Sequence, residues 1–365
     1  MAHREKFSLC DACAERQGDR TGFSIVGSED CFICRGLTSR FPEMGRRAVR
    51  RVQGYQFRTF SVGVIIPRGI QERDDQLRSD LRIRGRETIK SQMAREISAS
   101  VRSRTRRRVD RQHPDATILV DLDRDTIVIS ARSVFVYGRY TKPSGVPQRR
   151  ELCDRCKGRG CQECQSGYKE GVSVEEVLGK RLGRILNSPR AKFTWLGSED
   201  SESMVFPPGR PFIAEFKDPR KRKVPPNFVA RTGKGALKAT RLKVLKGKPT
   251  SIPSFTFKTR AFIQPEAPME ALPRGVAKSM KDVEIQFRNS KGRTVRKKVY
   301  SVRIERRGTG LVAEIKLDGG LPVKRLVSGG SVSLSLAELL KTPLSCQRFD
   351  ILRVWESGSF KFGKI

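Results

Sequence analysis

The sequence of 365 residues carries 75 Lys and Arg against 39 Asp and Glu, a formal net charge of +36. At about 150 residues per domain this length predicts two to three domains. An excess of one charge sign this large argues against an enzyme of neutral small molecules and indicates a polyanionic partner, either nucleic acid or an anionic membrane.

The sequence argues against a membrane partner. Its longest apolar stretches, such as residues 61–67, are much shorter than the ~20 residues of a spanning helix. The first residues, MAHREKFSLC, carry charges where a signal peptide needs an uninterrupted apolar segment. We therefore expect a soluble, cytoplasmic protein. Neither of its two histidines, His3 and His113, lies in the context of a catalytic triad.

Two C-x-x-C pairs near the N-terminus are separated by seventeen residues and comprise Cys10, Cys13, Cys31 and Cys34. This spacing is typical of a zinc site in which each pair presents two thiolates and the intervening loop completes a tetrahedron. A disulfide framework is the alternative, but a chain without a signal peptide is expected in a reducing compartment. We predict a structural Zn²⁺ site, with no coordination position left for catalysis.

The next segment has the pattern of a compact α/β unit. Residues 57–66 have the composition of a strand, and Ile89, Met93, Ile97 and Val101 recur every four residues, as on one face of a helix. Residues 116–122 and 126–137 are two β-rich runs around a turn at residues 123–125.

A dense run of arginines follows the predicted helix face, and we expect it to contact phosphates. Like charges at this density repel one another, so a solvated face is the less favoured interpretation. The predicted RNA-binding residues of this run are Arg102, Arg104, Arg106, Arg107 and Arg108.

A second cysteine group, CDRCKGRGCQEC, contains Cys153, Cys156, Cys161 and Cys164. Glycines inside it provide the backbone freedom to bring the two pairs together. The group predicts a second Zn²⁺ site; a metal-free turn or a redox pair are the alternatives. We expect the ninth cysteine, Cys346, to be a small buried apolar residue.

Residues 172–186 are expected to form a helix, and residues 190–216 a strand, an acidic loop, a Pro-Pro-Gly turn and another strand. The acidic loop holds Glu199, Asp200 and Glu202. A protein that binds polyanions has no electrostatic reason to place three carboxylates near its ligand unless one of them has a task.

Residues 217–260 contain fourteen Lys and Arg against one acidic residue. We predict RNA contacts from the densest part of this segment, Arg220, Lys221, Arg222 and Lys223. The rest of the chain alternates β-branched residues with turn signals, which predicts a largely antiparallel sheet with few long helices.

Several segments, in order along the chain, resemble the Pus-ten type of tRNA pseudouridine synthase, an archaeal and eukaryotic family associated with uridines 54 and 55 of the tRNA T-arm. They are CDAC…CFIC, VYGRYTKPSGVPQ at 136–148, CDRCKGRGCQEC, SVEEVLG and, above all, LGSEDSESMVFPPGRPFIAEFKDPRKR. The resemblance implies a tRNA partner bound at its T-arm.

The resemblance implies an α+β protein with a zinc-bearing region at 1–48, a THUMP-type α/β RNA-binding domain at 49–148, and a second four-cysteine element with a connecting helix at 149–180. A pseudouridine synthase domain at 181–365, built on a mixed, largely antiparallel sheet, is expected to follow.

The resemblance also implies the catalytic residues. GSED at 197–200 matches the family's GRED, which makes Asp200 the catalytic aspartate, and GGLPVKRLVSGG at 319–330 matches AGTYIKEFVHGD, which makes Lys324 its basic partner. Such enzymes need no organic cofactor.

The sequence departs from the family at three single positions and in the segment after Gly329, which is shorter than the family's GRT-containing turn. Ser198 stands for the Arg of GRED, Pro322 for a Tyr, and Leu242 for the Tyr expected near KYRAL. Because these enzymes stack the target base on an aromatic ring, Tyr300, Phe255 or Phe257 is expected to substitute.

Two alternatives remain at this stage. A catalytically degenerate tRNA-binding or folding protein would explain the missing tyrosines. A THUMP-containing tRNA thiolase is suggested by SGGSVS at 328–333, which resembles an SGGxDS phosphate loop and lies between a strand-like PVKRLV and a helix-like SLAELL. However, Val332 replaces the Asp of that loop, and too few residues follow for a nucleotide-binding domain.

Overall fold

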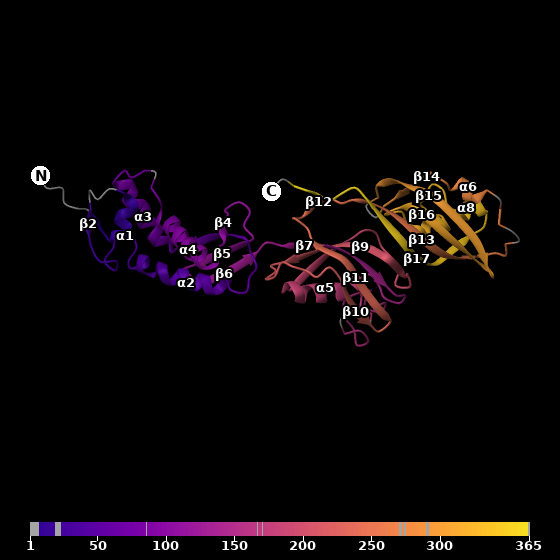
Figure 1. The fold of residues 1–365 in the computed structure, drawn as a ribbon, viewed down its shortest axis with the longest axis horizontal. Coiled ribbons are helices and arrows are strands. Elements are labelled where there is room, and N and C mark those ends of the chain that lie inside the picture. Colours follow the sequence, from indigo (N-terminus) through magenta and orange to yellow (C-terminus); the bar gives the residue numbers. More distant parts are fainter. Residues whose placement is uncertain are drawn as a thin grey trace. The chain divides into compact units, whose positions relative to one another are not determined.

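The computed structural model describes residues 7–18, 23–84, 86–165, 167–169, 171–269, 272–273, 275–289 and 292–363. His3 lies outside these residues. The chain divides into two compact units, Met1–Ser133 with Lys217–Arg222, and Val134–Phe216 with Lys223–Ile365. Figure 1 shows the elements of both. None of the described helices is long and apolar enough to cross a membrane.

The first unit begins with the cysteine-bearing region and continues into a four-stranded sheet. β3 runs parallel to β4 and β5, and β5 is antiparallel to β6, in the order β4-β3-β5-β6. The elements in chain order are β1 (Phe7–Leu9), α1 (Asp11–Gln17), β2 (Phe23–Ile25), η1 (Leu37–Arg40), α2 (Phe41–Val52), β3 (Thr59–Ile65), α3 (Arg68–Asp80), α4 (Ile89–Thr105), β4 (Arg108–Val109), β5 (Ala116–Asp121) and β6 (Thr126–Ala131).

The sequence pattern predicted this unit well. The strand expected at 57–66 is β3, and the periodic residues expected on one helix face, Ile89, Met93, Ile97 and Val101, are all buried on α4. α4 begins where the side chain of Thr88 accepts a hydrogen bond from the backbone of Ser91, an N-cap that satisfies a free helix N–H.

The cysteine region and the sheet share one hydrophobic core, which includes Cys13 and Cys31 together with Phe60 and Ile97. Residues 1–48 and the following α/β segment therefore form one unit, where we expected two. The unit also ends earlier than the expected boundary at 148, because residues 134–142 pair with strands of the second unit.

The second unit is built on a ten-stranded sheet. Its strand order is β10-β11-β7-β9-β17-β13-β16-β15-β14, with β8 attached to β9. The elements are β7 (Val134–Lys142), α5 (Val174–Leu186), β8 (Arg190–Trp195), β9 (Val205–Lys217), β10 (Phe228–Thr232), β11 (Gly235–Val244), β12 (Pro249–Ser251), β13 (Ser254–Pro265), α6 (Val276–Ser279), β14 (Val283–Arg288), β15 (Thr294–Arg307), β16 (Gly310–Asp318), α7 (Val323–Ser328), α8 (Leu336–Leu340), β17 (Leu344–Ser357) and β18 (Lys361–Phe362).

The large sheet is mixed and largely antiparallel, as expected, with β9 and β17 pairing in parallel. On β13 buried residues alternate with partly exposed ones along the strand. This period of two places one face of the sheet against the core and the other toward solvent. The helix expected at 172–186 is α5, which begins with a capping box between Ser173 and Glu176.

Three local expectations in this unit are wrong. Residues 126–137 form two strands in different units, β6 and β7. The Pro-Pro-Gly sequence lies inside β9 rather than in a turn, at a point where the pairing with β7 shifts register. PVKRLV is not a strand but forms α7, so the SGGSVS segment lacks the strand that the thiolase alternative requires.

Candidate active site

The structure brings Asp200 and Lys324 together. Nζ of Lys324 lies 3.0 Å from Oδ2 of Asp200; the Lys324 side chain is 48% exposed and the Asp200 side chain 36%. Oδ2 itself is inaccessible to solvent, and among the described residues its partner is the Lys324 ammonium. The carboxylate therefore has a cationic neighbour at Oδ2, while the rest of the half-exposed side chain stays accessible from the cavity.

Helix α7 places Lys324 at this position. Val323, Leu326 and Val327 are buried on one face of the helix, which packs on β17. Lys324 lies off that apolar face, in the first turn. Pro322 precedes the helix with a φ of −76°, which suits a helix start.

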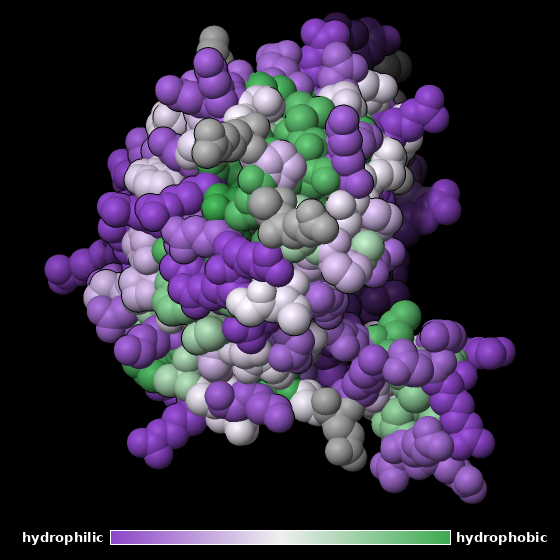
Figure 2. All heavy atoms as spheres, turned by 90° about the vertical axis from the view of Figure 1, so that its right-hand side faces the viewer, coloured by the Kyte–Doolittle hydropathy of each residue, from purple (hydrophilic) through white to green (hydrophobic). Residues whose placement is uncertain are grey.

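The pair lies in the wall of a cavity of about 470 Å³. Phe257 and Thr259 of β13, Phe287 of β14 and Phe349 of β17 also line it. The volume falls within the about 300–1,000 Å³ of small-ligand sites. The wall combines these apolar residues with charged ones, among them Arg210, Arg288 and Arg325. Figure 2 shows one face of the molecule, on which hydrophilic side chains surround a smaller apolar area.

A buried polar network holds the backbone of the loop that carries Asp200. The Glu199 side chain is fully buried; its Oε2 accepts a hydrogen bond from Arg210 at 2.8 Å and its Oε1 one from the Tyr140 hydroxyl at 2.9 Å. Nζ of Lys142, also fully buried, lies 3.9 Å from Oε1 and donates to the backbone carbonyls of Asp200 (3.1 Å) and Ser201 (3.0 Å).

Burial shifts the pKa of two groups in this network. Desolvation lowers the pKa of Lys142, against the opposing attraction of Glu199. Burial also raises the pKa of the Tyr140 hydroxyl well above its ordinary value. Tyr140 consequently stays neutral and can donate its proton to Glu199 while it accepts a hydrogen bond from Gln148.

Arg210 fixes the backbone that precedes Asp200. Its guanidinium donates to the carbonyls of Leu196 (2.9 Å) and Ser198 (3.2 Å) as well as to Glu199. Gly197 allows this close approach, since a Cβ there would lie 2.9 Å from Nη2 of Arg210 and its φ is +91°. Sequence reasoning missed Arg210 and Lys142, although both lie in stretches that carried the family resemblance.

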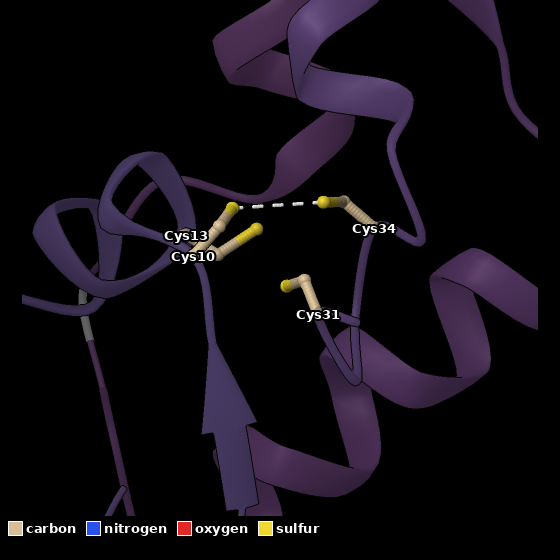
Figure 3. Close-up of side chains that lie close together, drawn as sticks. All are labelled: Cys10, Cys13, Cys31 and Cys34. Atoms are coloured by element: carbon tan, nitrogen blue, oxygen red, sulfur yellow. Dashed lines mark hydrogen bonds between the residues drawn. The ribbon is translucent and has the colours of Figure 1, made fainter. Parts of the chain in front are cut away.

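The first cysteine group forms a compact cluster. The four sulfur ligand atoms of Cys10, Cys13, Cys31 and Cys34 lie within 4.8 Å of one another, and Sγ of Cys10 is 3.6 Å from Sγ of Cys34. Figure 3 shows the four side chains pointing toward a common centre. Tetrahedral coordination at a Zn–S distance of about 2.3 Å separates sulfurs by about 3.8 Å, so the site fits such an ion. A disulfide needs about 2.05 Å, and all four cysteines are free.

The second cysteine group has the same geometry in a different setting. Sγ of Cys156 and Sγ of Cys161 each lie 3.5 Å from Sγ of Cys164, and the four ligand atoms again lie within 4.8 Å. Cys161 and Cys164 are only half-buried. Both clusters are therefore able to hold a metal ion, one inside a hydrophobic core and one near the surface.

Two family models match the chain, the archaeal Pus10 THUMP domain over residues 44–121 and the Pus10 C-terminal region over residues 135–246. The chain is 31% identical to the tRNA pseudouridine synthase Pus10 of Cenarchaeum symbiosum (strain A), over 96% of this chain and 90% of the relative. It is 28% identical to the tRNA pseudouridine synthase Pus10 of Nitrosopumilus maritimus (strain SCM1), over 95% of this chain and 94% of the relative. The chain belongs to the Pus10 family.

A chain of a solved Cbf5-Nop10-Gar1 complex is similar over 60% of this chain and 48% of that chain, with a TM-score of 0.32 and 14% sequence identity. This similarity is too low to support an argument from structure.

The Pus10 assignment confirms the expected THUMP-type domain, since its model spans α2 to β5 of the first unit. It also gives meaning to the residues around the cavity. Leu242 does not line the cavity but is buried in the core on β11, so it is not the counterpart of the tyrosine of KYRAL. The stretch KTRAF at 258–262 is closer to KYRAL, and its Thr259 lines the cavity.

The structure distinguishes among the three aromatic residues expected to replace the Pus10 tyrosines. Phe257 lines the cavity beside Asp200, and its ring lies under the Arg210 guanidinium at 5.6 Å. Phe255 and Phe257 are both buried in the same core, but Phe255 is not part of the cavity wall. Tyr300 is directed to the opposite face of the sheet, where its hydroxyl donates to Asp318.

The arginine run lies at the end of α4 and the start of β4. All five side chains are exposed, and none forms an ion pair with a described residue: Arg102, Arg104, Arg106, Arg107 and Arg108. A role in binding RNA remains a prediction for this run.

The predicted residues at 220–223 differ from one another. Arg220, whose guanidinium stacks at 5.3 Å from the Tyr55 ring, and Lys221 and Lys223 are exposed. Arg222 is only 18% exposed and lies 3.7 Å from Asp115, and burial lowers its pKa. Because its charge is directed to Asp115, Arg222 is a structural residue of the first unit rather than a free phosphate contact.

Proposed function

We propose that this chain is a tRNA pseudouridine synthase that isomerises uridines 54 and 55 of the T-arm, with Asp200 as the nucleophile and Lys324 as its cationic partner. The 3.0 Å contact between these two side chains at the cavity wall is the observation that carries the proposal. The exposed arginines of the THUMP-type domain and the net charge of +36 support a polyanionic substrate. With tRNA as substrate, we assign the enzyme to the cytoplasm.

The reaction needs little from the protein beyond a positioned carboxylate. The N1–C1′ bond of uridine breaks, the base turns, C5 bonds to C1′, and the proton that leaves C5 is balanced by the proton that N1 gains. An ionised carboxylate can attack the sugar or the base, or stabilise a cationic sugar. The neighbouring ammonium favours the ionised state when a substrate displaces water from the cavity.

A uridine of a folded T-arm has to leave its stack to reach Asp200, at a cost of a few kcal/mol. Phosphate contacts made elsewhere on the basic surface offset this cost. We assign the stacking ring to Phe257, because it is the aromatic residue of β13 that lines the cavity together with Thr259.

The test is incubation of T-arm RNA with the full chain, followed by carbodiimide mapping of pseudouridine, for the wild type and for Asp200→Ala. The wild type is expected to modify the T-arm uridines and the variant to leave them unchanged. A wild-type protein that binds this RNA without modifying it overturns the proposal.

Such a result would favour a second function, a tRNA-binding or folding protein without chemistry. The observation on its side is that Pro322 and Thr259 provide no aromatic ring at the two tyrosine positions of the family. Phe257→Ala separates the two functions further, since it should lower the rate of an enzyme but leave RNA binding by a degenerate protein unchanged.

We further propose that both cysteine clusters hold structural Zn²⁺. Four thiolates form a closed tetrahedral site, so the ion would stabilise the fold and take no part in the reaction. Metal analysis of the purified chain is expected to find two equivalents of zinc. Cys13→Ser and Cys156→Ser should each remove one equivalent, and a chain without zinc contradicts both assignments.

A further inference from the structure

The face of the large sheet that lies opposite the cavity carries several cationic and aromatic side chains. On β13, Phe257 and Thr259 point into the cavity, so the alternate residues Thr256, Lys258 and Phe262 lie on the other face. The register places Arg353 and Trp355 of β17 and Lys316 and Asp318 of β16 beside them.

Aromatic rings and cations alternate on this face. Nζ of Lys316 lies 5.5 Å from the Tyr300 ring and 5.1 Å from the Trp355 ring, and the guanidinium of Arg353 lies 5.4 Å from Trp355. The guanidinium of Arg348 lies 4.3 Å from the ring of Phe262. We call the set the basic-aromatic face; its members are Lys258, Arg260, Phe262, Lys298, Tyr300, Lys316, Arg348, Arg353 and Trp355.

The charge of this face is only partly balanced within the protein. Glu314 pairs with Lys258 and Arg260 at 2.7 Å each, and Asp282 pairs with Lys298 at 2.9 Å. Lys316, Arg348 and Arg353 form no ion pair with any residue in the described part of the chain. These three cations are thus held beside aromatic rings without a direct ion pair, although Asp282 attracts Lys316 at longer range.

We propose that the basic-aromatic face binds single-stranded RNA, with bases stacked on Trp355 and Tyr300 and phosphates at Lys316, Arg348 and Arg353. Aromatic platforms flanked by cations bind single strands in this way, because every base has a face to stack and every nucleotide has a phosphate. From Thr256 to Phe262 the face extends over about 20 Å of strand, enough for several nucleotides.

The composition of the face favours RNA over a protein partner. Trp355, at 37% exposure, is the one large hydrophobic residue exposed on the described parts of β13, β15, β16 and β17. A face for a protein partner would carry a contiguous apolar patch. The inference goes beyond the proposed function, since these residues lie on the face of the sheet that does not carry Asp200.

The fluorescence of Trp355 provides the test. The chain has two tryptophans, and Trp195 is stacked on Phe193 at 5.0 Å, away from this face. The full chain is titrated with an oligouridylate of about 12 nucleotides. We expect fluorescence quenching in the wild type and in Trp195→Phe. Binding followed by the anisotropy of a labelled oligonucleotide should weaken by about 5- to 100-fold in Trp355→Ala, the loss of one stacked base.

Two further variants make the test decisive. Trp355→Phe, which keeps a ring, should restore most of the affinity, so a loss in Trp355→Ala would not reflect unfolding. Lys316→Ala with Arg353→Ala should reduce the slope of log affinity against log salt by about 1.4 for a single strand. The matched pair Arg231→Ala with Lys238→Ala, exposed at the other end of the sheet, should bind the oligonucleotide through this face as the wild type does.

The outcomes separate this inference from the proposed function. Asp200→Asn should bind the oligonucleotide normally while isomerisation is lost. Absence of binding by the wild type, or equal affinity of Trp355→Ala and the wild type, overturns the RNA-binding role of the face, whatever the result of the pseudouridine assay.

Discussion

Glu199 and Asp200 are adjacent in the chain, but their carboxylates lie in two different regions, a buried polar network and the wall of the cavity. Glu199 is fully buried, with Arg210 and Tyr140 donating to its oxygens and Lys142 close by. Asp200 lies in the cavity wall with one half-exposed cation, Lys324, as its partner. Glu199 has several donors around it, whereas Asp200 has one cationic partner and a side chain that stays half-exposed.

The difference shows how one acidic segment can serve both structure and chemistry. A buried charge is tolerated only when it is paired and hydrogen-bonded, and Glu199 meets that condition. The network that surrounds it also holds the carbonyls of Ser198 and Asp200, and so determines the position of the loop. The Asp200 carboxylate therefore does not have to hold the loop in place and can act in the reaction. We expect mutations in the two regions to separate stability from activity.

The largest effect is expected for Asp200→Asn, which keeps the shape of the side chain and removes its charge. Loss of a nucleophile should lower the rate of isomerisation by at least about 1,000-fold. The thermal unfolding midpoint should change little, since the ion pair of Asp200 with Lys324 is half-exposed and such pairs contribute little to stability. Single-turnover kinetics and calorimetry measure the two. A variant that retains activity would remove Asp200 from the mechanism and with it this comparison.

Glu199→Ala should have the opposite profile. Removal of one partner from a buried ion pair leaves Arg210 and Lys142 without compensation, at a cost of about 3–5 kcal/mol in the free energy of unfolding. Urea denaturation measures this loss. The matched control is Glu202→Gln, whose exposed carboxylate is bonded to Ser144 and should change stability by less than about 0.5 kcal/mol. Equal losses in the two variants would contradict the structural role of Glu199.

Lys324→Met is expected to have a smaller effect on activity than Asp200→Asn. A positioned charge-stabilising donor in a dry site contributes about 100- to 1,000-fold, and a half-exposed one should contribute less, about 10- to 100-fold. The ratio kcat/KM on T-arm RNA measures it. Lys324→Arg should recover part of the rate if charge is what matters. Unchanged kinetics in Lys324→Met would mean that its contact with Asp200 has no role in the reaction.

Much of the fold followed from local sequence signals. The periodicity of α4, the helix at 172–186 and the β-rich composition of the segments that form β15 and β16 each depend on residues close together in the chain, which is why they could be predicted. The boundary between the units could not, because β7 joins the large sheet through pairing with β9 and β11, much later in the chain. PVKRLV has the composition of a strand, yet burial of Val323, Leu326 and Val327 on β17 makes it a helix.

The site shows the same division. The juxtaposition of Asp200 and Lys324 was expected from the resemblance, and the structure provides its geometry; their catalytic roles stay predictions. The support network was missed because Lys142 and Arg210 are two of 75 basic residues, and nothing in a basic chain distinguishes a buried cation from a surface one. Tyr300 and Leu242 were placed near the base on sequence alone, whereas the parity of a strand decides which face a side chain occupies.

The smallest expected effect is a pH dependence of the free energy of unfolding that comes from Lys142 in the buried network around Glu199. Burial lowers the pKa of Lys142, so the folded protein binds this proton less tightly than the unfolded chain does. Between the folded value and the ordinary value of 10.5, the unfolded chain is protonated and the folded protein is not, and the free energy of unfolding therefore rises with pH. Relative to Lys142→Met, the wild type should gain stability, measured by urea midpoints, as the pH rises through the folded pKa of Lys142 toward 10.5, and lose that gain as the pH falls back through it. The exposed Lys238→Met should show no such trend against the wild type.

A difference in stability between the wild type and Lys142→Met that stays constant over this pH range would mean that the lysine keeps its proton through its contact with Glu199. The network would then be held by charge rather than by the hydrogen bonds of Lys142 to the carbonyls of Asp200 and Ser201.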